Sequence, residues 1–159
     1  MDEQQNLRSG DAGQRAEAAE SLSQMGPDAG FAAVELVQAC GDDEAVAQFA
    51  VAALEDMGPP PAETLASVAE LMTSDQSEVA YWAITLVGRC GVAARDHQDA
   101  LASLVTTSTE INVRQRAVWA LGKIEARSDT ALQALRLAAA DSDARLSRLA
   151  GEALAVTQT

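Results

Sequence analysis

Side chains that could carry out chemistry are few in this sequence, and they stand far apart. His97 is the one histidine, and it is followed by Gln98 at the start of a predicted helix. A redox-active metal ion needs several imidazole and carboxylate ligands together, and a Ser, Thr or Cys nucleophile needs a base within reach. A single histidine between helices meets neither requirement. We therefore expect no catalytic residue, no metal site and no cofactor.

The two thiols are isolated from any base. Cys40 ends a predicted helix, and Cys90 occupies a position that is apolar at regular intervals along the chain. Buried thiols in apolar surroundings are unreactive packing groups. Reduced cysteines, a polar stretch after Met1 and the absence of a run of about 18 apolar residues favour a cytoplasmic protein that does not cross a membrane.

Two other clusters have structural interpretations. Asp42-Asp43-Glu44 could suggest acid–base or metal chemistry, but acidic residues at the start of a helix complement its dipole and cap its free N–H groups. Pro59-Pro60-Pro61 could be a polyproline ligand for a partner. Because it lies between two predicted helices, a stiff connecting loop is favoured instead.

A column of alanines, spaced 32 to 34 residues apart, identifies the elements that would position any site. Apolar residues accompany each alanine four residues before, four after and seven after, and these offsets lie on one face of an α-helix. Such periodicity is typical of stacked repeats. The alanines are Ala18, Ala50, Ala83, Ala117 and Ala150, preceded by Gln14, Val46, Val79, Val113 and Leu146 and followed by Leu22, Leu54, Val87, Leu121 and Leu154 and then by Met25, Met57, Cys90, Ile124 and Thr157.

These stripes predict an all-α fold of about nine helices and no strand. Short loops make neighbouring helices antiparallel, so they form hairpins that bury their remaining apolar edges by stacking. Residues 2–9 are polar and too few for a packed helix. The first helices of the pairs are expected over about 29–40 (capped by Asp28, with Phe31 in its stripe), 62–73, 97–107 and 129–139, and the second helices over about 12–25, 44–57, 77–90, 111–125 and 143–156. We expect one domain over 1–159, with repeats at about 11–26, 28–58, 61–91, 96–125 and 128–156.

The segment around Ala117 resembles a HEAT repeat. Its residues Asn112-Val113-Arg114, Ala117 and Ala120-Leu121-Gly122-Lys123-Ile124 are similar to the pattern Asp-x-x-Val-Arg-x-x-Ala-x-x-Ala-Leu-Gly-x-Ile of the HEAT-like repeats first named from phycobilisome lyases. The resemblance extends over about 11–156. It implies a right-handed α-solenoid of antiparallel helix pairs, an ARM/HEAT-like superhelix, with the second helices on its concave side. The arginine of the pattern is present as Arg15 and Arg114 but replaced by Ala47, Ala80 and Ser147, so we do not expect an arginine ladder.

The charge is distributed unevenly. Residues 1–88 hold 16 acids and 2 bases, a net charge of −14, whereas residues 89–159 hold 8 acids and 9 bases, a net charge of +1. The acidic half repels phosphate backbones and anionic lipid, so we expect neither nucleic acid nor a membrane as partner. It could attract a basic segment of a protein, or it could serve solubility alone.

Four of the five aromatic residues lie on consecutive second helices. Tyr81 and Trp119 stand almost opposite the buried stripe, where they should be exposed. Phe49 and Trp82 stand at its edge, where contact with the next repeat is as reasonable as exposure. Exposed rings are typical binding anchors, and the expected partner-binding residues are Phe49, Tyr81, Trp82, Trp119, Gln48, Arg89, Gln115, Arg116 and Lys123. The alternative is that all four rings complete the packing between repeats.

These observations favour a non-enzymatic scaffold that binds a protein or peptide segment on the concave surface of the second helices. The resemblance alone also allows a second class, a bilin lyase or another protein that handles a small ligand. A third hypothesis is self-assembly into a homodimer, since Leu149 makes the last helix less polar than the first.

Overall fold

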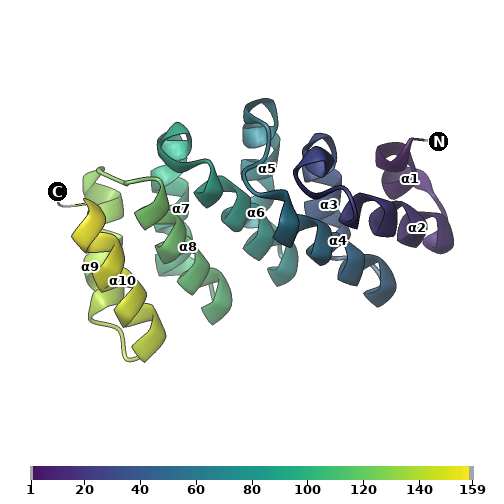
Figure 1. The fold of residues 1–159 in the computed structure, drawn as a ribbon. Coiled ribbons are helices and arrows are strands. Elements are labelled where there is room, and N and C mark those ends of the chain that lie inside the picture. Colours follow the sequence, from purple (N-terminus) through teal and green to yellow (C-terminus); the bar gives the residue numbers. More distant parts are fainter. Residues whose placement is uncertain (1, 158–159) are drawn as a thin grey trace. The chain divides into compact units, whose positions relative to one another are not determined.

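The computed structural model describes residues 2–157, and its regular elements over this range are all helices (Figure 1). The predicted all-α fold of helix pairs is confirmed. The described α-helices are α1 (Glu3–Ser9), α2 (Ala12–Ser23), α3 (Ala33–Ala39), α4 (Glu44–Met57), α5 (Leu65–Glu70), α6 (Ser77–Arg89), α7 (Gln98–Thr107), α8 (Ile111–Lys123), α9 (Asp129–Ala139) and α10 (Ala144–Thr157). The 3-10 helices are η1 (Gly26–Ala32), η2 (Ala62–Thr64), η3 (Leu71–Thr73) and η4 (Gly91–His97).

The chain divides into two compact units, Met1–Leu86 and Val87–Thr159. The division falls within α6, so that the last turn of this helix belongs to the second unit. The expectation of a single domain over 1–159 stays a prediction.

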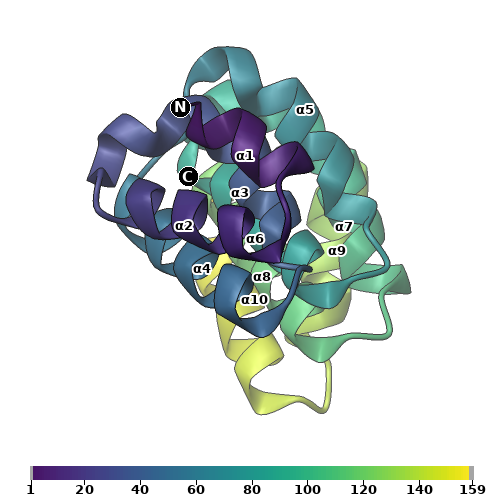
Figure 2. The ribbon, with the colours of Figure 1, turned by 90° about the vertical axis from the view of Figure 1, so that its right-hand side faces the viewer.

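Within each unit the helices form two layers (Figure 2). In the first unit α1, α3 and α5 pack in succession, while α2 packs against α4. In the second unit α7 packs against α9 and α8 against α10, and the hairpins α7–α8 and α9–α10 join the layers. The second helices of the repeats therefore share one layer in each unit, as the sequence predicts.

The alanine column lies in the core of both units. Ala18 is 4% exposed, and the other four column alanines are fully buried. The stripe is less buried in the first and last repeats, where Gln14 is exposed, Met25 is 37% exposed and Leu154 is half-buried. Cys90 is half-buried, which corrects its expected full burial.

Within residues 2–9, Glu3–Ser9 form the helix α1, contrary to expectation. Asp2 caps α1 by accepting a hydrogen bond from the Gln4 backbone N–H at 3.1 Å. Leu7 is 7% exposed, and Arg8 donates to the buried carboxylate of Glu35 on α3 through Nε at 2.8 Å and through Nη2. A helix this short is not stable alone. Its packing on α2 and α3 outweighs its polar composition, and it accounts for the tenth helix.

The predicted helix over 29–40 is also corrected. Its first half is the 3-10 helix η1, and Asp28 makes no N-cap for α3. The tighter 3-10 turn changes which side chains face inward, and Phe31 is 45% exposed. Gly30 admits the Pro61 ring, because a Cβ at Gly30 would lie 2.9 Å from Pro61 Cδ. Pro61 thus packs between neighbouring repeats, as expected for a stiff loop.

Two arginines of the HEAT-like pattern make equivalent ion pairs. Arg15 binds Asp42 through Nε at 2.7 Å and Nη2 at 2.9 Å, and Arg114 binds Asp141 at 3.0 Å. Both pairs join residues 27 apart, so each connects one repeat with the next inside a single unit. One such pair therefore exists in each unit. Because Ala47, Ala80 and Ser147 stand at the other three positions, the two pairs remain isolated and do not continue into an arginine ladder.

The acidic run at α4 is held by the first of these pairs. Asp43 stands at the N-cap position but makes no side-chain capping bond, whereas Asp42 accepts from Arg15 and from the Asp43 N–H at 2.7 Å. The Arg15 guanidinium holds the pKa of Asp42 below its usual range. The cluster is therefore structural, although its main partner is a side chain of the preceding repeat.

Three of the second helices end at a position with positive φ. Gly26, Gly58 and Gly91 have φ of 57°, 75° and 60°. Each of these glycines stands eight residues after a column alanine. In the repeat of Ala117 the equivalent residue is Glu125, with φ of 52°. It closes a Schellman motif, in which Ala126 N–H donates to Leu121 O at 3.0 Å and Glu125 N–H to Gly122 O at 3.2 Å. Only glycine adopts this conformation without strain.

At this repeated position, replacing glycine by alanine and replacing glutamate by glycine should change the free energy of unfolding in opposite directions. The space around Gly91 is open, since the nearest atom to an added Cβ is Lys123 O at 3.9 Å. Gly91→Ala should therefore lower the free energy of unfolding by about 1 kcal/mol through backbone strain alone. Glu125→Gly should raise it by a few tenths, because relief of strain exceeds the loss of the partly exposed Arg95 pair. Urea unfolding of both variants measures this, and a stabilising Gly91→Ala would refute the strain argument.

The Arg15–Asp42 pair should make stability depend on pH. The lowered pKa of Asp42 means that its contribution is present above the unfolded pKa, about 4, and is lost as pH falls through the lower folded pKa. The melting temperature of Asp42→Asn should therefore lie below that of the wild type at neutral pH and converge with it in acid. Exposed Asp75→Asn is the control, for which we expect the wild-type profile. A constant gap between wild type and Asp42→Asn would contradict the assignment.

Candidate functional site

Trp119 on α8 is held between two cations. The guanidinium of Arg116 lies 4.8 Å from the ring centroid, and the Lys123 ammonium lies 5.8 Å from it. Arg116 precedes Trp119 by three residues and Lys123 follows it by four, so the helix itself brings all three side chains to one face. Cation–π attraction at a partly exposed site contributes about 0.5–1 kcal/mol per pair. The ring is therefore held in a defined orientation on the outer face of α8.

The six-membered edge of the Trp119 ring lies against glycine. A Cβ added at Gly88, in the last turn of α6, would be 2.5 Å from Trp119 Cζ3 and 3.2 Å from Ala120 Cβ. Gly88 thus provides the space for the indole. The ring is half-buried, because it contacts this backbone and yet leaves part of its surface open.

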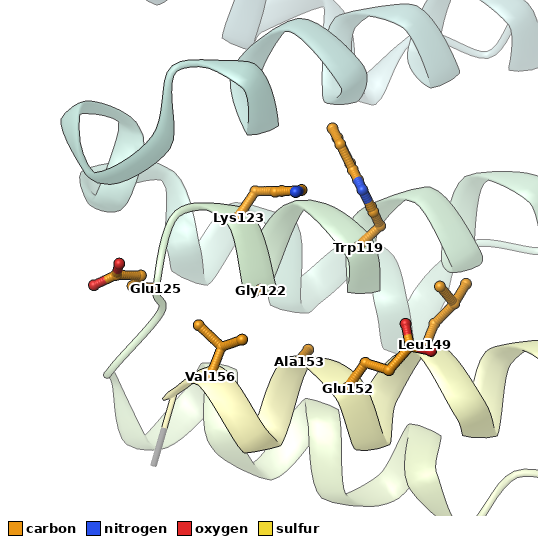
Figure 3. A pocket seen from close by; sticks show the side chains of 8 residues that line it. All are labelled: Trp119, Gly122, Lys123, Glu125, Leu149, Glu152, Ala153 and Val156. Carbon is orange, nitrogen blue, oxygen red and sulfur yellow. The ribbon is translucent and has the colours of Figure 1, made fainter. Parts of the chain in front are cut away.

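A pocket of about 430 Å³ opens next to this ring, between α8 and α10 (Figure 3). Figure 3 shows Trp119 and Lys123 rising from the same side of α8, with the Lys123 ammonium directed towards the ring. Apolar surface comes from Leu149, Ala153 and Val156 of α10, and the floor includes Gly122. The remaining lining residues are Lys123, Glu125 and Glu152. An apolar pocket with a few charged groups is the usual form of a small binding site.

The predicted aromatic residues of the first unit have different environments. Trp82 is 7% exposed, so its expected role in a binding surface is wrong. Trp82 stands at the edge of the buried stripe, and its side chain belongs to the core. Tyr81 is half-buried and meets the Trp82 ring edge to face, with centroids 5.7 Å apart. Phe49 is half-buried and Gln48 is exposed on α4.

The second unit brings together three of the predicted site residues, namely Arg116, Trp119 and Lys123. Gln115 instead donates through Nε2 to Asp143 at 3.0 Å, which ties α8 to the start of the next second helix. Arg89 is half-buried at the end of α6. The predicted set is therefore divided between two units, and the structure assembles only the α8 cluster.

Sequence reasoning missed the α10 side of the pocket. The sequence indicates only that Leu149 makes the last helix less polar, and Val156 is not among the predicted site residues. A signal was present, because Gly88 and Gly122 both stand five residues after a column alanine. A small residue at this offset indicates a place where the next helix, or a ring, approaches closely.

The two thiols lie in environments that disfavour the reactive thiolate. Burial, together with the charge of Glu78, raises the pKa of the Cys40 thiol to about 12, and burial also raises the pKa of Cys90. His97 is half-buried at the N-cap position of α7. Across residues 2–157, no three His, Cys, Asp or Glu residues are grouped so that they could hold a metal ion.

Between residues 2 and 157, none of the helices has the length and apolar character needed to span a bilayer.

Comparison with known proteins identifies repeat proteins of the same fold. A profile of HEAT repeats matches residues 65–155, more than half of the chain. An engineered protein has a TM-score of 0.69 at 23% identity, over 98% of this chain and 77% of that one. A second engineered protein has a TM-score of 0.67 at 22% identity, over 99% of this chain and 47% of that one, so this chain spans about half its length. A designed armadillo repeat protein in complex with the peptide (KR)4 has a TM-score of 0.68 at 20% identity, over 97% of this chain and 80% of that one.

These structural likenesses show an armadillo- and HEAT-like α-solenoid fold, as the sequence predicts. None of the curated proteins matches the chain.

The raised thiol pKa values predict slow reaction with a thiol reagent. In the folded chain at neutral pH, half-buried Cys90 should react slowly, and Cys40 should react only after unfolding. Measurement with an aromatic disulfide on the wild type and on Cys90→Ser separates the two thiols. Rapid labelling of Cys40 in folded Cys90→Ser would show an accessible thiolate and would reopen nucleophilic chemistry.

Proposed function

This chain belongs to the HEAT-repeat family, and we propose that it is a binding scaffold rather than an enzyme, whose second helices hold a segment of a protein partner. The observation that carries this proposal is the cluster of Arg116, Trp119 and Lys123 beside the pocket between α8 and α10. The unreactive thiols and the lack of a metal-binding group over 2–157 favour binding over catalysis.

The α8 cluster suits a peptide because it is fixed before binding. A large ring that is already oriented loses little conformational freedom when a partner covers it. The flanking cations supply donors for backbone carbonyls or carboxylates of the partner. The adjoining pocket gives apolar surface, and anchors placed beside such pockets are typical of binding hot spots.

The second helices of the first unit carry a candidate surface of their own. Gln48 and the acidic residues Glu55 and Asp56 are exposed on α4, and Phe49 and Tyr81 are half-buried. Because residues 1–88 carry a net charge of −14, this surface favours a basic segment of the partner. The (KR)4 peptide bound by the designed armadillo repeat protein is of this kind.

A test of this function is selection of binders from a displayed library of random peptides, followed by titration of labelled peptides. Trp119→Ala should weaken a selected peptide by about tenfold, which corresponds to about 1.4 kcal/mol. The matched control is Phe31→Ala, which removes an exposed ring from η1, outside the second helices, and should leave affinity unchanged.

Fluorescence anisotropy gives the dissociation constants. Peptides with a basic segment should also bind less tightly as salt is added, because exposed charges are screened. If no peptide is enriched, or if every enriched peptide tolerates Trp119→Ala, the second-helix surface is not the binding site.

A further inference from the structure

We propose that the pocket beside Gly122 binds an indole ring, the side chain of a tryptophan in the partner segment. This inference rests on the proposed function and names the chemistry of one subsite within it. Its basis is that the chain already fills the equivalent place, one repeat earlier, with an indole of its own.

Gly88 and Gly122 are equivalent positions of successive repeats, each five residues after a column alanine. A Cβ at Gly88 would lie 3.2 Å from Ala120 Cβ, and a Cβ at Gly122 would lie 3.2 Å from Ala153 Cβ. Ala120 and Ala153 are themselves equivalent, each three residues after a column alanine. The same close contact between glycine and alanine therefore occurs twice, with the same spacing.

Different side chains belong to the positions over Gly88 and Gly122. Over Gly88 lies the Trp119 ring, with Cζ3 and Cη2 at 2.5 and 3.1 Å from an added Cβ. The residue equivalent to Trp119 in the next repeat is Glu152, whose side chain is 60% exposed and pairs with Arg148 at 2.9 Å. Glu152 therefore leaves Gly122 uncovered by a ring, and the 430 Å³ pocket lies at this place.

The lining of the pocket complements an indole. Leu149, Val156 and Trp119 offer apolar and aromatic contact, and Val156 is 48% exposed. The carboxylates of Glu125 and Glu152 only accept hydrogen bonds, whereas the indole N–H only donates. The positive edge of an aromatic ring also favours nearby carboxylates. A cavity of roughly 150 Å³ is enough for benzene, so this pocket has room for a larger ring.

The test uses N-acetyl-tryptophanamide as probe and amide chemical shifts of the full chain as readout. Saturable shifts are expected at Gly122, Ala153 and Val156, with weaker binding of the phenylalanine amide and none of the leucine amide. Glu152→Trp should fill the pocket with the chain's own ring, raise the melting temperature and abolish these shifts. The matched control, Leu137→Trp, adds an exposed ring on α9 outside the lining of the pocket and should retain saturable binding.

A second variant keeps the test decisive if Glu152→Trp fails to fold. Val156→Lys alters an exposed wall residue and should weaken the tryptophan amide at least fivefold without unfolding the chain. The inference is overturned if the wild type shows no saturable shift at these amides, or if folded Glu152→Trp binds the probe as the wild type does.

The two proposals can fail separately. If selected peptides depend on Trp119 but are unaffected by Glu152→Trp, the indole subsite is wrong and the scaffold function stands. If the tryptophan amide binds at Gly122 but no peptide is ever enriched, the subsite stands and peptide binding is wrong.

Discussion

Close approach of second helices over small side chains is the interaction on which the rest of this structure depends. The column alanines are buried in both units, and a Cβ added at Gly122 would lie 3.2 Å from Ala153 Cβ, closer than an ordinary contact. Burial of apolar surface drives this contact, and the small residues allow it to form between backbones. The outer faces of the second helices then remain available for other uses.

The same constraint produces the candidate site. A glycine on the outer edge of a second helix creates a shallow place on which a flat ring can lie, and Trp119 uses this place at Gly88. Its cationic neighbours hold the ring in position without burying it completely. Where the next repeat carries Glu152 in place of the ring, the place stays open as a pocket. The packing of Trp119 at Gly88 and the proposed binding pocket at Gly122 therefore both follow from a glycine at one repeated position.

The fold could be predicted from the sequence because its periodic stripe reports directly on burial. α4 and α9 have the bounds that the stripe predicts. α1 could not be predicted, since its stability comes from Leu7 and Arg8 contacting helices that are distant in sequence. The site could be predicted in part. The three α8 residues could be predicted because they share a helical face. Trp82 stands at the edge of the stripe, where the sequence cannot decide between burial and exposure. The pocket becomes visible only when equivalent positions of two repeats are compared.

Cross-saturation in the complex with a selected peptide tests the central claim most directly, because it maps the amides that a bound partner approaches. The account predicts saturation transfer to the second helices, strongest along α8 and α10 around Trp119 and Gly122. Transfer confined to α7 and α9, or to α1, α3 and α5, would contradict it and would place the partner on the opposite layer.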